Sequence, residues 1–158
     1  MYRLLIVEDE KWEREGLRDF LDWNSLGIEV AGCACNGVEG VKMAELYRPE
    51  IILTDIMMPK MDGIRMSQEV RTFLPDARII ILSGYDDFQY AKQTFEFHAF
   101  AYLLKPIEKK HVEEVIFGVL KVTVGVRNYS YFGALFKSRF GLSPGDCKEI
   151  LKGRQDYV

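Results

Sequence analysis

Five short apolar runs alternate with segments of helical periodicity, and this alternation constrains the fold more than any other feature. The runs are rich in Ile, Val and Leu and lie at residues 2–7, 28–35, 51–55, 78–83 and 101–104. Their length and composition predict β-strands, and the segments between them predict amphipathic helices. Strands that alternate with helices form a parallel sheet with right-handed crossovers and helices on both faces. We therefore predict a doubly wound α/β fold with a five-stranded parallel sheet.

The segments between the runs carry apolar stripes at spacings typical of a helix. Their members are Trp12, Leu17, Phe20 and Leu21; Val38, Val41, Ala44 and Leu46; Ile64, Val70 and Phe73; and Phe88, Ala91 and Phe95. A final helix is predicted from about Glu108, with an apolar side made by Val112, Val115, Ile116, Val119 and Leu120. We expect these stripes to cover the sheet.

Length and composition fit one domain with room for a short extra element: the chain has 158 residues, of which 48% are hydrophobic. No apolar stretch reaches the roughly 18 residues that would span a bilayer, and the N-terminus lacks a signal segment. The expectation is a soluble cytoplasmic protein without a membrane partner. Cys33 and Cys35 alternate on a predicted strand, which favours reduced, packed thiols over a disulfide.

Charge is divided unevenly along the chain. Residues 1–120 hold 14 Lys and Arg against 21 Asp and Glu, whereas residues 121–158 hold 7 against 3. An acidic body with a basic tail is a weak indication of nucleic-acid contact, or of a tail that docks on the body.

Polar side chains stand where four of the predicted strands end. Glu8 and Asp9 follow the first run, Asp55 ends the third, Ser83 ends the fourth and Lys105 follows the last. Each alone would be read as a helix cap or turn residue. In a doubly wound sheet, however, the functional crevice lies outside the carboxyl ends of the strands. Five such residues at those ends predict a site.

The three acids in this group predict a hard metal ion. Neighbouring carboxylates raise one another's pKa unless a cation neutralises them. All-oxygen ligands favour Mg²⁺, or Mn²⁺ in its place, and Mg²⁺ keeps waters that a phosphate donor can replace. Asp55 could then attack phosphorus as a nucleophile, with the metal and Lys105 offsetting charge and Ser83 donating a hydrogen bond. The product would be an aspartyl phosphate.

Four motifs resemble those of one family, the receiver domains of two-component response regulators. They are Leu4–Glu10 (LLIVEDE), Thr54–Gly63 (TDIMMPKMDG), Ile81–Phe88 (ILSGYDDF) and Ala101–Pro106 (AYLLKP). The resemblance covers about residues 1–120, and we take residues 1–121 as the receiver domain. It implies the strand order 2-1-3-4-5 and a phosphorylation-activated regulator that takes its phosphoryl group from a sensor histidine kinase.

The resemblance also implies roles for individual residues. Asp55 is similar to the phosphoacceptor, Glu8 and Asp9 to the acidic pair, the Met57 carbonyl to a further metal ligand, Lys105 to the phosphate-contacting lysine, and Ser83 and Tyr102 to the switch pair. Phosphorylation would then reshape the face made by the fourth helix, fifth strand and fifth helix. A cis Lys105–Pro106 bond is implied as well. His98 departs from the pattern, because relatives usually carry glycine at this helix end, which needs a positive φ.

The tail, residues 122–158, is predicted to form two short helices. The first has an aromatic face and ends at Gly141, and Ser143-Pro144 begins the second. The segment resembles the end of an AraC-type DNA-binding domain, most of whose helices are missing, as if by an internal deletion. Arg127, Lys137 and Arg139 are candidate phosphate contacts, although we expect DNA binding only from an intact output domain.

Two other classes of function compete with a phosphorylation switch. A phosphatase that works through an aspartyl phosphate usually carries a second aspartate two residues after its nucleophile, where this chain has Met57, so we do not expect an enzyme beyond its own phosphotransfer and dephosphorylation. The alternative is a phosphorylation-independent interaction or dimerisation module with a vestigial pocket. Homodimers could form through the face of the fourth helix, fifth strand and fifth helix, or by exchange of the C-terminal helices.

Overall fold

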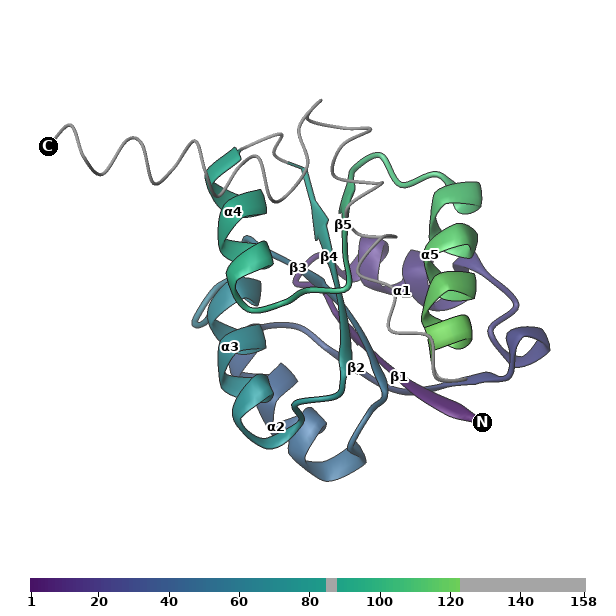
Figure 1. The fold of residues 1–158 in the computed structure, drawn as a ribbon, viewed down its shortest axis with the longest axis horizontal. Helices are drawn as coiled ribbons and strands as arrows, with labels where there is room; N and C mark the ends of the chain where they lie inside the picture. Colours follow the sequence, from purple (N-terminus) through teal and green to yellow (C-terminus); the bar gives the residue numbers. More distant parts are fainter. Residues whose placement is uncertain (85–87, 123–158) are drawn as a thin grey trace, which may run out of the picture.

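The computed structural model describes residues 1–84 and 88–122, which form a parallel sheet between two layers of helices (Figure 1). The five strands are β1 (Tyr2–Val7), β2 (Ile28–Ala34), β3 (Ile51–Asp55), β4 (Arg78–Ser83) and β5 (Ala101–Leu104). The helices are α1 (Lys11–Phe20), α2 (Gly37–Tyr47), α3 (Gly63–Phe73), α4 (Phe88–Glu96) and α5 (Lys109–Val122), with a short 3₁₀ turn at Asn24–Leu26. The predicted alternation of strand and helix is confirmed.

The sheet has the order β2-β1-β3-β4-β5, and every neighbouring pair is parallel. β1 lies beside β3 with Val7 opposite Thr54, so the residues that follow these two strands emerge next to each other. On the other side of β3, β4 places Leu82 opposite Asp55. This register brings the carboxyl ends of the central strands to one edge, as the doubly wound prediction required.

Each face of the sheet has its own apolar cluster, because side chains alternate along every strand. On one face, Leu4 and Ile6 of β1 pack with buried residues of α1 and α5. On the other, Leu5 and Val7 pack with buried residues of α2 and α3. Figure 1 shows α1 and α5 together on one side of the sheet and α2, α3 and α4 on the other.

Three side chains lie differently from the prediction. Trp12 is 82% exposed and Leu46 is 72% exposed, although both were assigned to apolar stripes. Trp12 stands five residues before the buried Leu17, or about 140° around the helix, so it faces away from the sheet. Leu46 is similarly about 160° from Ala44. Cys35 was expected to be packed, but it lies beyond the end of β2, is exposed, and donates from its thiol to Glu39 Oε2 at 2.8 Å.

Helix and loop ends follow local sequence signals. Asp62 caps α3 by accepting from the Arg65 amide at 2.7 Å. His98 has a φ of 57°, so the helix end expected to need a positive φ has one, and the Lys105–Pro106 bond is cis.

No helix within the described ranges is long and apolar enough to cross a membrane. The two predicted tail helices, with Arg127, Lys137 and Arg139, lie outside the described residues.

Candidate functional site

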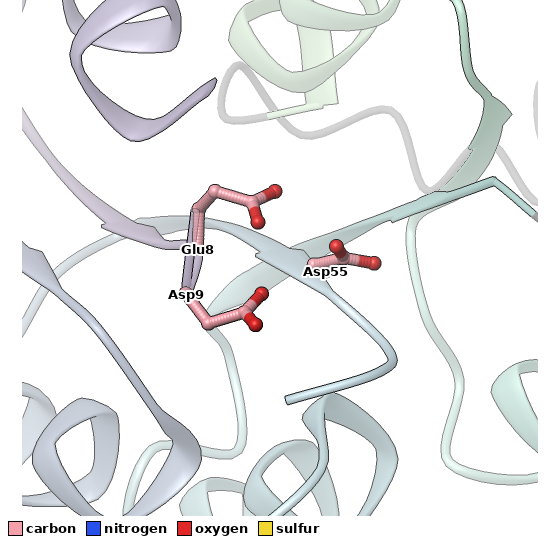
Figure 2. A group of neighbouring side chains, drawn as sticks. All are labelled: Glu8, Asp9 and Asp55. Atoms are coloured by element: carbon pink, nitrogen blue, oxygen red, sulfur yellow. The ribbon is translucent and has the colours of Figure 1, made fainter. Parts of the chain in front are cut away.

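Three carboxylates converge at the carboxyl edge of the sheet (Figure 2). Glu8 and Asp9 follow β1, Asp55 ends β3, and one oxygen of each lies within 4.8 Å of the others. The parallel pairing of β1 with β3 creates this group, since two strands distant in sequence end side by side. The sequence prediction of an acidic cluster at this position is confirmed.

The Lys105 ammonium lies among these acids. Its Nζ donates to Glu8 Oε2 and to Asp55 Oδ2, each at 3.0 Å. It also donates to Glu13 Oε2, from the first turn of α1. Lys105 reaches the site because it directly follows β5, where its amide donates to the Ser83 carbonyl at 2.8 Å. The Lys105 ammonium therefore donates to three carboxylates.

The Asp55 carboxylate is fixed at both oxygens. Oδ1 accepts from the Ile56 amide at 2.6 Å, while Oδ2 accepts from Lys105. Behind it, α3 begins so close that a Cβ on Gly63 would lie 1.8 Å from the Asp55 carbonyl oxygen. Only glycine permits this approach, which is why the Gly63 amide can donate to the Ile56 carbonyl at 2.8 Å.

Burial sets the protonation of the cluster. The Glu8 side chain is 0% exposed. The pKa of its carboxyl is raised to about 7, chiefly by burial; the hydrogen bond from Lys105 lowers the pKa in part, and the charge of Asp55 adds to the rise. For Lys105, burial alone would lower the pKa, but the hydrogen bonds to Glu13, Glu8 and Asp55 together raise it above its ordinary value. The ammonium is thus charged at neutral pH, whereas Glu8 titrates there.

Two residues of α1 belong to this site and were not predicted. Glu13 contacts Lys105, and Arg14 donates from Nη1 to the carbonyls of Glu8 and Asp9 at 2.7 and 3.2 Å. An acid near the start of a helix is common for another reason, its favourable interaction with the helix dipole, and an arginine on a helix surface is common in any position. The only signal in the sequence was their position four and five residues after Asp9, on the helix that leaves the same edge.

The remaining predicted residues lie around the same edge. Ser83 is fully buried at the end of β4, and Tyr102 of β5 is partly buried against the apolar cluster on the face of α2 and α3. The Met57 side chain, 49% exposed, accepts at Sδ from the Tyr90 hydroxyl of α4 at 3.3 Å. Metal ligation by the Met57 carbonyl and the switch roles of Ser83 and Tyr102 stay predictions.

The residues at this edge fit a divalent cation. Carboxylate oxygens are the ligands that Mg²⁺ and Mn²⁺ prefer, and the three acids are close enough to share one ion. The cluster also has more negative charge than Lys105 alone neutralises when all the acids are ionised. The acidic group is therefore compatible with Mg²⁺.

Comparison with known proteins agrees with this fold. Residues 4–117 match the family model of the response regulator receiver domain, and the chain belongs to this family. It is 36% identical over 116 residues to the transcriptional regulatory protein HptR of Staphylococcus aureus, an alignment that covers 73% of this chain. The chain spans only 45% of the length of that relative.

Solved structures give the same assignment. The receiver domain of AraT, a response regulator from Geobacillus stearothermophilus, is 34% identical with a TM-score of 0.73, and the match covers 77% of this chain and 95% of that one. A two-component transcriptional regulator AraC from Clostridium phytofermentans is 32% identical with a TM-score of 0.72, covering 78% and 96%. Residues 4–117 thus form the receiver domain of a two-component response regulator.

Proposed function

We propose that this receiver accepts a phosphoryl group on Asp55 from a sensor histidine kinase. The observation that supports the proposal is the position of the Asp55 carboxylate, 3.0 Å from the Lys105 ammonium and within a cluster of acids that fits a divalent cation. In the transfer, an Asp55 oxygen forms a bond to phosphorus while the bond from phosphorus to the donor breaks. The electron pair of the broken bond leaves with the donor.

Each neighbouring group has a part in this step. Glu8, Asp9, Asp55 and the Met57 carbonyl would hold Mg²⁺, or Mn²⁺ in its place, and the ion supplies positive charge to the phosphoryl oxygens. Lys105, already beside Asp55, would donate to phosphoryl oxygens and so stabilise the charge on the transferring group. These are properties of a phosphoacceptor that catalyses only its own phosphotransfer and dephosphorylation.

The proposed switch begins at Ser83, the last residue of β4. Ser83 donates to the phosphoryl group, Tyr102 turns inward behind it, and the α4-β5-α5 face takes its active arrangement. That face would carry a homodimer or contact an output domain. The relatives HptR and AraC are transcriptional regulators by name, which supports a role in transcription.

The tail is proposed as a remnant of an AraC-type output domain, with residues 1–121 as the receiver and residues 122–158 as the remnant. Arg127, Lys137 and Arg139 would contact DNA phosphates only where the rest of such a domain is present. Exchange of the tail helices between protomers is a second route to a dimer. The cytoplasm is the compartment that a histidine kinase partner implies.

Intact-mass measurement tests the phosphoacceptor. The wild-type protein is incubated with phosphoramidate, with and without Mg²⁺, beside Asp55→Asn and the control Asp62→Asn, which keeps a capping side chain on α3. We expect one added phosphoryl group in wild type and in Asp62→Asn, only with Mg²⁺, and none in Asp55→Asn. An unmodified wild type would overturn the proposal in favour of a phosphorylation-independent interaction module.

A further inference from the structure

Each N–H donor of the Lys105 ammonium has a carboxylate acceptor in this structure. An ammonium has three N–H donors, and Nζ contacts one oxygen each of Glu8, Asp55 and Glu13. A phosphoryl group on Asp55 would need at least one of these donors. One of the present carboxylates must therefore give up its contact before Lys105 can serve the phosphoryl group.

The three carboxylates differ in what their release would cost. The Glu8 side chain is fully buried, so losing Lys105 would leave its carboxylate without the cation that offsets its burial. Asp55 carries the phosphoryl group, so the donor that it accepts can pass to a phosphoryl oxygen, and a second donor becomes available only if Glu8 or Glu13 gives up its contact. The Glu13 side chain is 50% exposed, so water can solvate its carboxylate as soon as it leaves. Glu13 is the partner that Lys105 loses most easily.

The geometry of α1 supports the same assignment. The helix begins at Lys11, so Glu13 stands in its first turn, and Arg14 beside it is held to the carbonyls of Glu8 and Asp9. The backbone that carries Glu13 is thereby anchored to the acidic loop. Rotation of the Glu13 side chain alone is enough to free the ammonium.

We propose that Glu13 is a positioning residue that holds Lys105 in the unphosphorylated state and competes with the phosphoryl group for its ammonium. The inference rests on the proposed function of Asp55 and adds a residue to it. Glu13 then opposes phosphorylation in two ways: it occupies a donor of Lys105, and it adds a negative charge to a site that receives an anion. The contact re-forms when the phosphoryl group is lost.

A neutral side chain at this position should favour the phosphorylated state. Glu13→Gln keeps the length and shape of the side chain but removes its charge. An ion pair with an exposed partner contributes a free energy equivalent to about a two- to fivefold change in an equilibrium constant, and removing one of its charges loses that contribution. We expect Glu13→Gln to bind beryllofluoride, a phosphoryl analogue, about two- to fivefold more tightly at saturating Mg²⁺. Its rate of phosphorylation by phosphoramidate should rise in the same direction.

Glu15→Gln is the matched control. It removes the same charge from the same helix, where Glu15 lies 4.0 Å from Lys11 and is not among the carboxylates that Lys105 contacts. A purely electrostatic effect of the helix would appear in both variants, whereas loss of the contact appears only in Glu13→Gln. The ¹⁵N signal of Lys105 Nζ, assigned by its absence in Lys105→Met, gives a readout without phosphorylation and should shift only in Glu13→Gln.

The outcomes separate this inference from the proposed function. If wild type neither binds beryllofluoride nor accepts a phosphoryl group, the function of Asp55 is wrong and the role of Glu13 falls with it. If wild type does both but Glu13→Gln equals wild type, only the role of Glu13 is overturned. An equal gain in Glu15→Gln also overturns it, because the gain would then not require contact with Lys105. A selective gain with a selective Nζ shift supports it.

Discussion

Replacing Glu8 with Gln should make the domain more stable at neutral pH than the natural sequence. The Glu8 side chain is completely buried, and this burial raises the pKa of its carboxyl to about 7 from an ordinary value of 4.5. Between these two values the folded protein holds a proton that the unfolded chain has released. Stability must therefore depend on pH across this interval.

The direction follows from which state binds more protons. The folded state binds more, so the free energy of unfolding falls as pH rises from about 4.5 to about 7. At about 1.4 kcal/mol for each pKa unit, ionising Glu8 costs the wild type roughly 3 kcal/mol. The amide of the Glu8→Gln variant carries no titrating proton, so this loss does not occur in the variant. The Lys105 pKa is raised above 10.5, so Lys105 stays protonated in both states throughout this interval. Its contribution to the free energy of unfolding therefore changes only at higher pH.

Urea denaturation followed by fluorescence of the buried Trp23 measures this difference. With a chelator present, the free energy of unfolding of Glu8→Gln minus that of wild type should rise by roughly 2 to 3 kcal/mol between about pH 5 and pH 8. Other carboxyls, including Glu39 and Glu50 with lowered pKa values, titrate in both proteins and cancel. The exposed Glu45→Gln variant is the control. A constant difference across the range would refute the reasoning.

Three further predictions concern the backbone and the metal. Gly63→Ala should abolish cooperative thermal unfolding, because its Cβ would lie 1.8 Å from the Asp55 carbonyl oxygen, whereas Gly16→Ala in α1, with nothing within 4 Å, should raise the melting temperature. Arg71→Ala should lower the free energy of unfolding in urea by about 2 kcal/mol or more, since the guanidinium donates to four backbone carbonyls, two in the loop after α3 and two just after α4. Mg²⁺ at about 100 times its dissociation constant should raise the free energy of unfolding of the wild type by about 2.7 kcal/mol in the same assay. A chelator should reverse this gain, and Asp9→Asn should largely lack it.

The fold and the acidic cluster could be predicted because they depend on local patterns with few solutions. A continuous apolar run such as Ile51, Ile52 and Leu53 has to be buried on both faces, and a parallel sheet is the arrangement that does so. Once the strands are parallel, Glu8 and Asp55 must emerge at the same edge. The contact of Lys105 with both acids follows from the same topology.

The role of α1 could not be predicted in this way. Whether Glu13 reaches Lys105 depends on the angle at which the helix leaves the sheet, and that angle is set by the packing of Leu17 and its neighbours. The spacing of Trp12 from Leu17 suggested an apolar stripe, yet the side chain faces away from the sheet. Periodicity identifies a helix more readily than it fixes the rotation of its first turn.

Burial of Glu8 connects the stability of this domain with its proposed chemistry. A buried, partly protonated carboxyl is unfavourable for folding, and the apolar clusters on both faces of the sheet offset its cost. A divalent cation held by this cluster would reverse the balance, because it would bind the ionised carboxylate and offset the cost of ionisation. The same substitution should therefore have opposite effects in two assays: Glu8→Gln gains stability without metal and loses the stabilisation that Mg²⁺ gives to the wild type. A buried acid that binds no metal would gain stability from the substitution in both conditions, so the pair of measurements separates a structural acid from a metal ligand.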